Sequence, residues 1–419
     1  MMMNEIDLIE QAYEFYASGD VKEALAKLDQ AIAKAADEGD QLNQARAMGK
    51  KGVILLEADQ LEAARVCLEE VLAFSEELEN QELKADALSN LGLVFTKSGD
   101  PGTGLLKQQE ATFIARETEN RSLVMTHLGL LGHAYIQLAN MEEAGKVYFE
   151  ALPIAKEIGD ISAQCGFLNN LGIIFGNLDQ HENAIRAFLE LSDLAVESGD
   201  YTLALNAEKN LVKHAIAEGK IEEIISHSRK GLDLIKTHLS DANDEREAFE
   251  EMLLLGLMSK RDYAAAEQEI IEIIKKAETV GNKPKLLTAL GQIADAHYAL
   301  GKIADAEEEY QRALDLSVRL QEKSIQARIL GRLAAISADQ DDLEKSNQFL
   351  FKGLEISNAL KDQAILGEQH YLLALNYKEL ENLEQALEHA HKSVECYLAS
   401  GSDSPGVKAR TLLESLLSS

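Results

Sequence analysis

Proline is nearly absent from this chain, with four residues among 419, well below the usual share of about 5%. Proline in a helix interior costs about 3 kcal/mol, so its scarcity removes the main obstacle to a chain that is helical throughout. Tryptophan is absent and aromatic residues make up only 5%, which leaves mainly aliphatic side chains to form a core. Hydrophobic residues still reach 46%, enough for a packed interior.

Cysteines and long apolar runs are also scarce. The three cysteines, Cys67, Cys165 and Cys396, are far apart and odd in number, which argues against a disulfide framework and favours a reducing compartment. No segment approaches the roughly 20 apolar residues that span a bilayer, and the acidic amino terminus has no signal-peptide features. The sequence therefore predicts a cytoplasmic protein without membrane insertion.

Positive charge is the third deficit, because 41 Lys and Arg face 72 Asp and Glu, for a net charge of −31. Such a surface repels nucleic acid and anionic lipid, since binding them depends on Lys and Arg neutralising phosphates. The large negative charge can instead serve to keep the protein soluble, or it can attract a basic partner.

The chain repeats itself with a period of 40 residues. Four glycines, Gly52, Gly92, Gly132 and Gly172, stand 40 positions apart, and each is followed three residues later by a large apolar residue: Leu55, Phe95, Tyr135 and Phe175. Small residues recur about twelve positions after most of these glycines, as at Ala64, Ala144 and Ala184. Counting units along the whole chain predicts about ten repeats.

Each unit has the pattern of two helices. Within 83–98 the apolar residues follow helical spacing, and Ser98-Gly99-Asp100-Pro101 then supplies a glycine stop, an Asp cap and proline at the first helical position. Gly-Asp pairs recur at 19–20, 39–40, 159–160 and 199–200. The recurring mid-helix glycines indicate close approach of paired helices, and such units bury their apolar faces only by stacking.

This pattern, with Leu-Gly, an aromatic residue and alanines on the second helix, resembles the tetratricopeptide (TPR) repeat over nearly the whole chain. The resemblance implies an all-α, right-handed superhelical solenoid of antiparallel helix pairs. The period is 40 instead of 34 and the closing proline is missing. Both departures resemble a long-helix subclass found in spindle-orientation scaffolds and bacterial peptide-sensing regulators.

The matches are weakest at 203–240 and 245–280, on both sides of the acidic run 241–247. We therefore expect a hinge or an altered superhelix there. It divides an amino-terminal array at 1–240, with about six repeats, from a carboxy-terminal array at 241–404, with about four. Pro405 is expected to begin a final helix, so that residues 405–419 cap the array with a stripe of Leu412, Leu413, Leu416 and Leu417.

Motifs for chemistry are missing. There is no phosphate loop in a strand context, no His-Glu-x-x-His, and no nucleophile with a base nearby. His389 and His391 are two residues apart and so point to different helix faces, and His133 is isolated. The sequence predicts neither an enzyme nor a bound cofactor or metal.

In the family that the chain resembles, the first helix of each unit lines an inner groove and binds peptides there. Carried over by position, this implies a set of peptide-binding residues, which we call the groove stripe: Arg46, Lys50, Asn90, His133, Asn169, Asn170, Asn206, Lys209, Asn210 and Lys213.

The stripe is basic in a strongly acidic chain. It holds four Lys or Arg, with Asp86 the one acidic residue in the same register, whereas the next unit carries Glu247, Glu250 and Glu251 and a later one carries Arg328 and Arg332. A primary amide has two donors and an acceptor, so asparagines at one register suit the backbone of an extended peptide. We expect a non-enzymatic scaffold or adaptor that binds a protein or peptide, with an acidic segment of the partner in the amino-terminal groove. A regulatory sensor whose superhelix closes on a peptide is the alternative.

Overall fold

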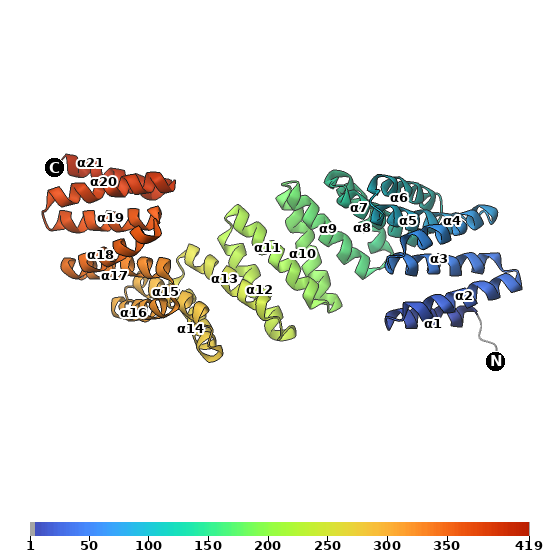
Figure 1. Cartoon of the computed structure of the whole chain (residues 1–419), viewed down its shortest axis with the longest axis horizontal. Coiled ribbons are helices and arrows are strands. Elements are labelled where there is room, and N and C mark those ends of the chain that lie inside the picture. Colours follow the sequence, from blue (N-terminus) through green and yellow to red (C-terminus); the bar gives the residue numbers. More distant parts are fainter. Residues whose placement is uncertain (1–4, 419) are drawn as a thin grey trace. The chain divides into compact units, whose positions relative to one another are not determined.

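The computed structural model of the protein describes residues 5–418, and in this range every regular element is an α-helix and no strand occurs. Figure 1 shows the 21 helices of the described residues, which form ten successive pairs and one final helix. The predicted all-α solenoid of helix pairs is confirmed. None of the described helices combines the length and hydropathy needed to cross a bilayer.

The helices of the first six pairs are α1 (Glu5–Ala17), α2 (Val21–Glu38), α3 (Gln41–Glu57), α4 (Leu61–Glu77), α5 (Gln81–Lys97), α6 (Pro101–Arg116), α7 (Arg121–Gln137), α8 (Met141–Ile158), α9 (Ile161–Asn177), α10 (His181–Ser198), α11 (Tyr201–Glu218) and α12 (Ile221–His238). The remaining helices are α13 (Asn243–Lys260), α14 (Tyr263–Val280), α15 (Lys283–Ala299), α16 (Ile303–Leu320), α17 (Lys323–Asp339), α18 (Leu343–Leu360), α19 (Gln363–Glu379), α20 (Leu383–Ser400) and α21 (Asp403–Leu417).

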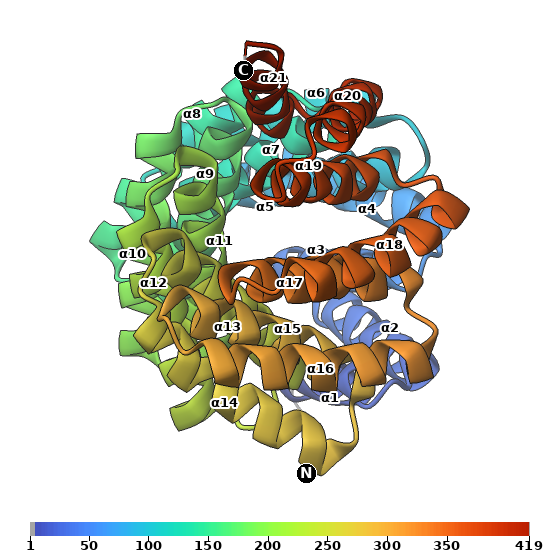
Figure 2. The ribbon, with the colours of Figure 1, turned by 90° about the vertical axis from the view of Figure 1, so that its left-hand side faces the viewer.

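The chain divides into two compact units. Unit 1 comprises the residues up to 223 together with 230–243, and unit 2 comprises 224–229 and the residues from 244 onward. From α1 to α11, and again from α14 to α21, each helix packs against the next, as expected of a solenoid. Figure 2 shows α16, α17 and α19 of unit 2 stacked in this order. The expected hinge and the division into six and four repeats remain predictions.

The predicted Gly-Asp stops form the helix ends. Gly39 has a left-handed φ of 73°, and the Asp40 side chain accepts a hydrogen bond from the Asn43 N–H at the start of α3. Glycine adopts this φ without the steric cost that a Cβ brings, and the Asp cap satisfies a donor that the helix leaves free. The same arrangement ends α8 and α10 and begins α9 and α11.

The mid-helix glycines mark where paired helices touch, as predicted. A Cβ added to Gly132 would lie 2.7 Å from the Tyr148 ring, and one added to Gly172 would lie 2.6 Å from the Phe188 ring. Gly52 meets Leu68 in the same way. In each pair the second-helix residue, sixteen positions later, is fully or almost fully buried and fills the space that the missing side chain leaves.

The final helix begins at Asp403, two residues before the predicted start at Pro405. Leu412 and Leu416 are buried and Leu413 packs beside them against α19 and α20, so these three leucines cover apolar surface at the end of unit 2. The prediction was wrong for Leu417, which is 65% exposed. It is the second-last residue before the end of the described chain, after the last turn that contacts α20.

The sequence did not predict a contact between two histidines of unit 2, half-buried His370 and buried His389. The His389 ring lies 2.9 Å from the His370 ring, Nδ1 to Nδ1, and stacks on Tyr377. His389 is 6% exposed. One ring must donate and the other accept in this contact, so at least one of the two rings is neutral in the folded protein. Burial lowers the pKa of His370 to about 4, helped by His389 and Lys392 and opposed by Glu388, and burial also lowers the pKa of His389.

The histidine pair predicts acid sensitivity of unit 2. The unfolded chain takes up protons near pH 6.5, whereas folded His370 resists protonation down to about pH 4. Stability is therefore fully present above pH 6.5 and is lost progressively as the pH falls toward 4. For half-buried His370 the loss stays below the roughly 3 kcal/mol that the whole shift would give, because solvent screens the ring. Urea unfolding between pH 7.5 and 4.5 measures this loss. His370→Gln should flatten the profile, whereas His391→Gln, at an exposed position of α20, should not. If the stability of both variants depends on pH in the same way, the acid sensitivity does not come from His370.

Candidate functional site

The groove stripe lies on the first helices of five successive pairs, α3, α5, α7, α9 and α11, all in unit 1. Its members are exposed or half-buried, while the residues between them are buried: Ala47 and Met48 follow Arg46, and Ala207 follows Asn206. This alternation follows from the helical period, which turns one side of each first helix to its neighbours and leaves the other open. That these residues bind a peptide remains a prediction.

One part of the stripe forms a pocket. A hollow of about 470 Å³ lies between α1, α3 and α5, and its polar lining consists of Tyr13, Arg46, Lys50, Asp86 and Asn90. Lys50 Nζ lies 3.3 Å from the Tyr13 hydroxyl and 5.0 Å from the centre of its ring. Tyr13 was missed in the sequence, although it stands 40 positions before Val53, in the same register as His133 and Lys213.

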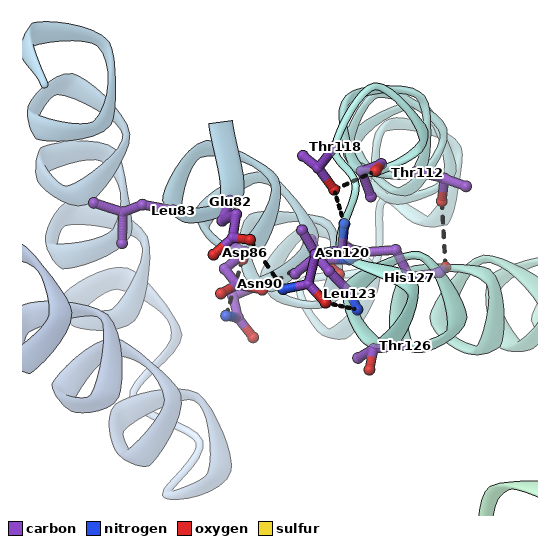
Figure 3. A network of polar contacts seen from close by, with 12 residues as sticks. Glu82, Leu83, Asp86, Asn90, Thr112, Thr118, Asn120, Leu123, Thr126 and His127 are labelled. Atoms are coloured by element: carbon purple, nitrogen blue, oxygen red, sulfur yellow. Dashed lines mark hydrogen bonds and ion pairs between the residues drawn. The ribbon is translucent and has the colours of Figure 1, made fainter. Parts of the chain in front are cut away.

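Figure 3 shows how α5 is held against α7 behind this pocket. The Asn120 side-chain amide donates to Glu82 Oε1 at 2.9 Å, and His127 Nε2 lies 3.3 Å from Asp86 Oδ1. His127 is only 1% exposed, and neither ring nitrogen has hydrogen-bond geometry, so its contact with Asp86 is one of proximity. Asp86 itself remains exposed at the pocket.

Two of the three stripe asparagines at one register already have partners in the fold. The Asn90 amide donates to the Asp86 carbonyl of its own helix at 3.0 Å. Asn170 hydrogen-bonds the hydroxyl of buried Tyr148, whose pKa burial raises to about 12 while the Asn170 bond opposes the rise. An Asn170→Ala change would therefore remove the partner of a buried phenol as well as a groove amide.

The basic residues of the groove stripe, unlike these asparagines, have few partners in the fold. Arg46, Lys209 and Lys213 make no ion pair with any described residue, and Lys50 contacts only Tyr13. On the second helices of the same unit, by contrast, Arg116 pairs with Glu150 at 2.7 Å and Lys156 with Glu190 at 2.5 Å. In an acidic chain the stripe thus keeps its positive charges free.

Two of the three acidic residues in the next repeat, Glu247 and Glu250, have a cation beside them. Lys285 Nζ lies 3.1 Å from Glu247 and 3.2 Å from Glu250. The described residues contain no group of three side chains able to hold a metal ion.

Sequence profiles of the tetratricopeptide repeat match residues 128–162, in unit 1, and residues 286–320, in unit 2. These matches show that the chain contains tetratricopeptide repeats in both units, and its ten helix pairs agree with that repeat. Its place in the long-period subclass remains a prediction.

No curated protein matches the chain. Among solved structures, the apo form of RapI is similar at 14% identity and a TM-score of 0.44, covering 71% of this chain and 99% of that one. Aspartyl phosphate phosphatase F from Bacillus subtilis is 16% identical with a TM-score of 0.41, covering 69% of this chain and 75% of that one. The apo quorum sensor NprR from B. thuringiensis is 17% identical with a TM-score of 0.40, covering 75% and 89%. These weak similarities assign no function.

Proposed function

We propose that this protein is a non-enzymatic scaffold or adaptor that binds an acidic peptide segment along the groove stripe of unit 1. The observation that carries the proposal is the set of unpaired cations on one face: Arg46, Lys209 and Lys213, with Lys50 beside Tyr13. A protein with 31 surplus negative charges has carboxylates available for every cation. Cations that remain without one are free to make charge-assisted bonds to a partner.

The pocket between α1, α3 and α5 suits one part of such a segment. Arg46 and Lys50 offer donors to a carboxylate, and exposed Asp86 excludes a second carboxylate from its side, which gives the pocket a direction. The half-buried Asn210 amide, with no partner among the described residues, is available for the peptide backbone further along. Each such bond contributes only about 0.5–1.5 kcal/mol net, so several must act together.

The test compares two groove variants with a matched control. The first variant is Arg46→Gln with Lys50→Gln, and the second is Lys209→Gln with Lys213→Gln. The control, Lys22→Gln with Arg186→Gln, makes the same charge change on exposed positions of α2 and α10. The probe is a pool of fluorescent eight-residue peptides of acidic, neutral or basic composition, followed by fluorescence polarisation.

We expect the acidic peptides to bind, and to bind more weakly as salt is raised, because screening weakens exposed charge pairs. At least one groove variant should lose about tenfold in affinity, equal to about 1.4 kcal/mol. The control should match the parent. Equal binding by parent and both groove variants, or no preference for acidic peptides, would reject the proposal. Compaction of the protein on peptide binding, seen by solution scattering, would favour a sensor over a scaffold.

A further inference from the structure

A further pocket lies in unit 2 between the second helices α16 and α18, next to the start of α17. Its volume is about 560 Å³, within the range of small-ligand sites. None of its lining residues occupies the groove register, which on α17 includes Arg328 and Arg332. This pocket, which we call the outer slot, is therefore distinct from the predicted peptide groove.

The interior of the outer slot is apolar. Apart from Gln326, its buried and half-buried lining residues are Leu314, Leu330, Phe349 and Ile356, and Leu330 is only 4% exposed. A ligand with an apolar part would remove the remaining accessible surface of these side chains from water, which is favourable in proportion to the area buried.

Elsewhere in the chain, an ion pair bridges successive second helices at one repeated position. The pairs join residues 34 positions apart: Arg116–Glu150 between α6 and α8 at 2.7 Å, Lys156–Glu190 between α8 and α10 at 2.5 Å, and Glu278–Arg312 between α14 and α16 at 3.1 Å. In each of these pairs a cation and a carboxylate face each other across the gap between two helices.

The outer slot lacks this ion pair. Val318 stands forty positions after Glu278, and Lys352 stands forty positions after Arg312. The cation of the pair is thus kept, whereas the carboxylate opposite it is replaced by a valine that is 52% exposed. Lys352 is exposed and makes no ion pair with any described residue. An unpaired cation therefore lies beside an open apolar slot, in a chain with a surplus of carboxylates.

The remaining charged residues of the outer slot limit the charge of a ligand. Lys323, at the start of α17, is a second exposed cation without a described ion pair. Two carboxylates also line the slot: Asp315, which accepts a hydrogen bond from the Gln311 amide at 3.2 Å, and exposed Glu355. These carboxylates repel a multiply charged anion such as phosphate, because like charges placed close together cost free energy. The slot therefore suits a single negative charge.

We infer that the outer slot binds an aliphatic monocarboxylate. The carboxylate lies beside Lys352, where it replaces the partner that Glu278 provides for Arg312 in the preceding repeat, and the aliphatic chain covers the apolar interior. A peptide fits less well, since its backbone would bring N–H and C=O groups against apolar side chains, where unpaired polar groups cost free energy. The outer slot is separate from the groove stripe of unit 1, so this inference does not depend on the proposed function.

Isothermal titration of the full chain with defined probes tests the inference. The probes are octanoate, hexanoate, octan-1-ol, octylammonium and the peptide N-acetyl-Leu-Glu-Leu amide. Octanoate should bind best. Hexanoate should bind at least about fivefold more weakly, because two methylene groups fewer are buried. Octan-1-ol and octylammonium should each bind at least about threefold more weakly, because neither offers a carboxylate to Lys352.

Two variants with matched controls place the ligand in the outer slot. Lys352→Gln should weaken octanoate binding at least about threefold, whereas Lys378→Gln, at an exposed position of α19 with no described ion pair, should bind like the parent. Val318→Glu restores a carboxylate opposite Lys352 and should weaken binding at least about tenfold. Its control is Leu398→Glu, which lies at the same repeat position on α20, is 65% exposed and should bind like the parent.

All four substituted residues are exposed, so each variant should keep the helical circular dichroism of the parent. Four results would each overturn the inference: octan-1-ol or octylammonium binding as tightly as octanoate, the peptide binding more tightly than octanoate, unchanged octanoate binding by Val318→Glu, or no octanoate binding at roughly 10 mM.

Discussion

Replacing Lys230 by methionine should destabilise unit 1 by about 3 kcal/mol, because it leaves a buried carboxylate without its cation. Glu208 is fully buried, and its Oε1 lies 2.9 Å from Lys230 Nζ and 2.5 Å from the Ser192 hydroxyl, which donates to it. Lys230 is itself 40% exposed, so the loss falls at the lower end of the range for broken buried pairs. Urea unfolding of the full chain measures it.

The register of the repeats supplies the control. The position of Glu208 is occupied by Met48, Leu88, Leu128 and Leu168 in the preceding repeats, and all four are buried. Glu208→Leu combined with Lys230→Met should therefore restore the parent stability or exceed it, since an apolar pair avoids the cost of burying charge. If the single Lys230→Met variant unfolds at the same urea concentration as the parent, the charge pair contributes nothing.

A second large effect is expected at Gly172, where alanine should cost about 2–3 kcal/mol. The new Cβ would lie 2.6 Å from the ring of Phe188, which is 1% exposed, so the ring or the helix must move. Alanine normally favours a helix by about 1 kcal/mol over glycine, and the packing conflict must outweigh this gain. Thermal unfolding followed by circular dichroism measures the net change.

Gly166 is the matched control on the same helix, α9. It has open space around its Cβ position, so Gly166→Ala should raise stability by up to about 1 kcal/mol through helix propensity alone. Opposite signs at the two glycines would show that the close approach, and not the helix itself, requires glycine at 172. The same sign for both substitutions would refute the packing account.

For the groove residues, the repeat register predicted positions along the helices but not hydrogen-bond partners. Position alone placed Asn90, Asn170 and Asn210 at one register, and all three side chains are half-buried in the structure. It did not show that Asn90 donates to its own helix or that Asn170 holds the Tyr148 hydroxyl. Those partners depend on which residue the second helix presents, and Tyr148 occupies a position that Leu68 and Phe188 fill in other repeats.

By itself, the sequence determined the class of fold and the positions of the helix ends. These follow from local chemistry that recurs with the repeat: Gly39 and Gly159 supply left-handed turns, Asp40 and Asp160 cap the next helices, and periodic apolar residues define the packed faces. Even so, Ala139 adopts a positive φ of 55° at a turn where Gly19 and Gly99 stand in other repeats, so the stacked helices impose the turn where the residue does not favour it.

Only the tertiary structure decided which side chains meet. The Glu208–Lys230 pair of unit 1 and the His370–His389 pair of unit 2 join residues that are 22 and 19 positions apart. A helical period states which face a residue occupies, but the residue opposite it is set by the angle and stagger between stacked helices. The angle and the stagger depend on how all the side chains of an interface fill its volume together. A single position in the repeat therefore cannot predict them.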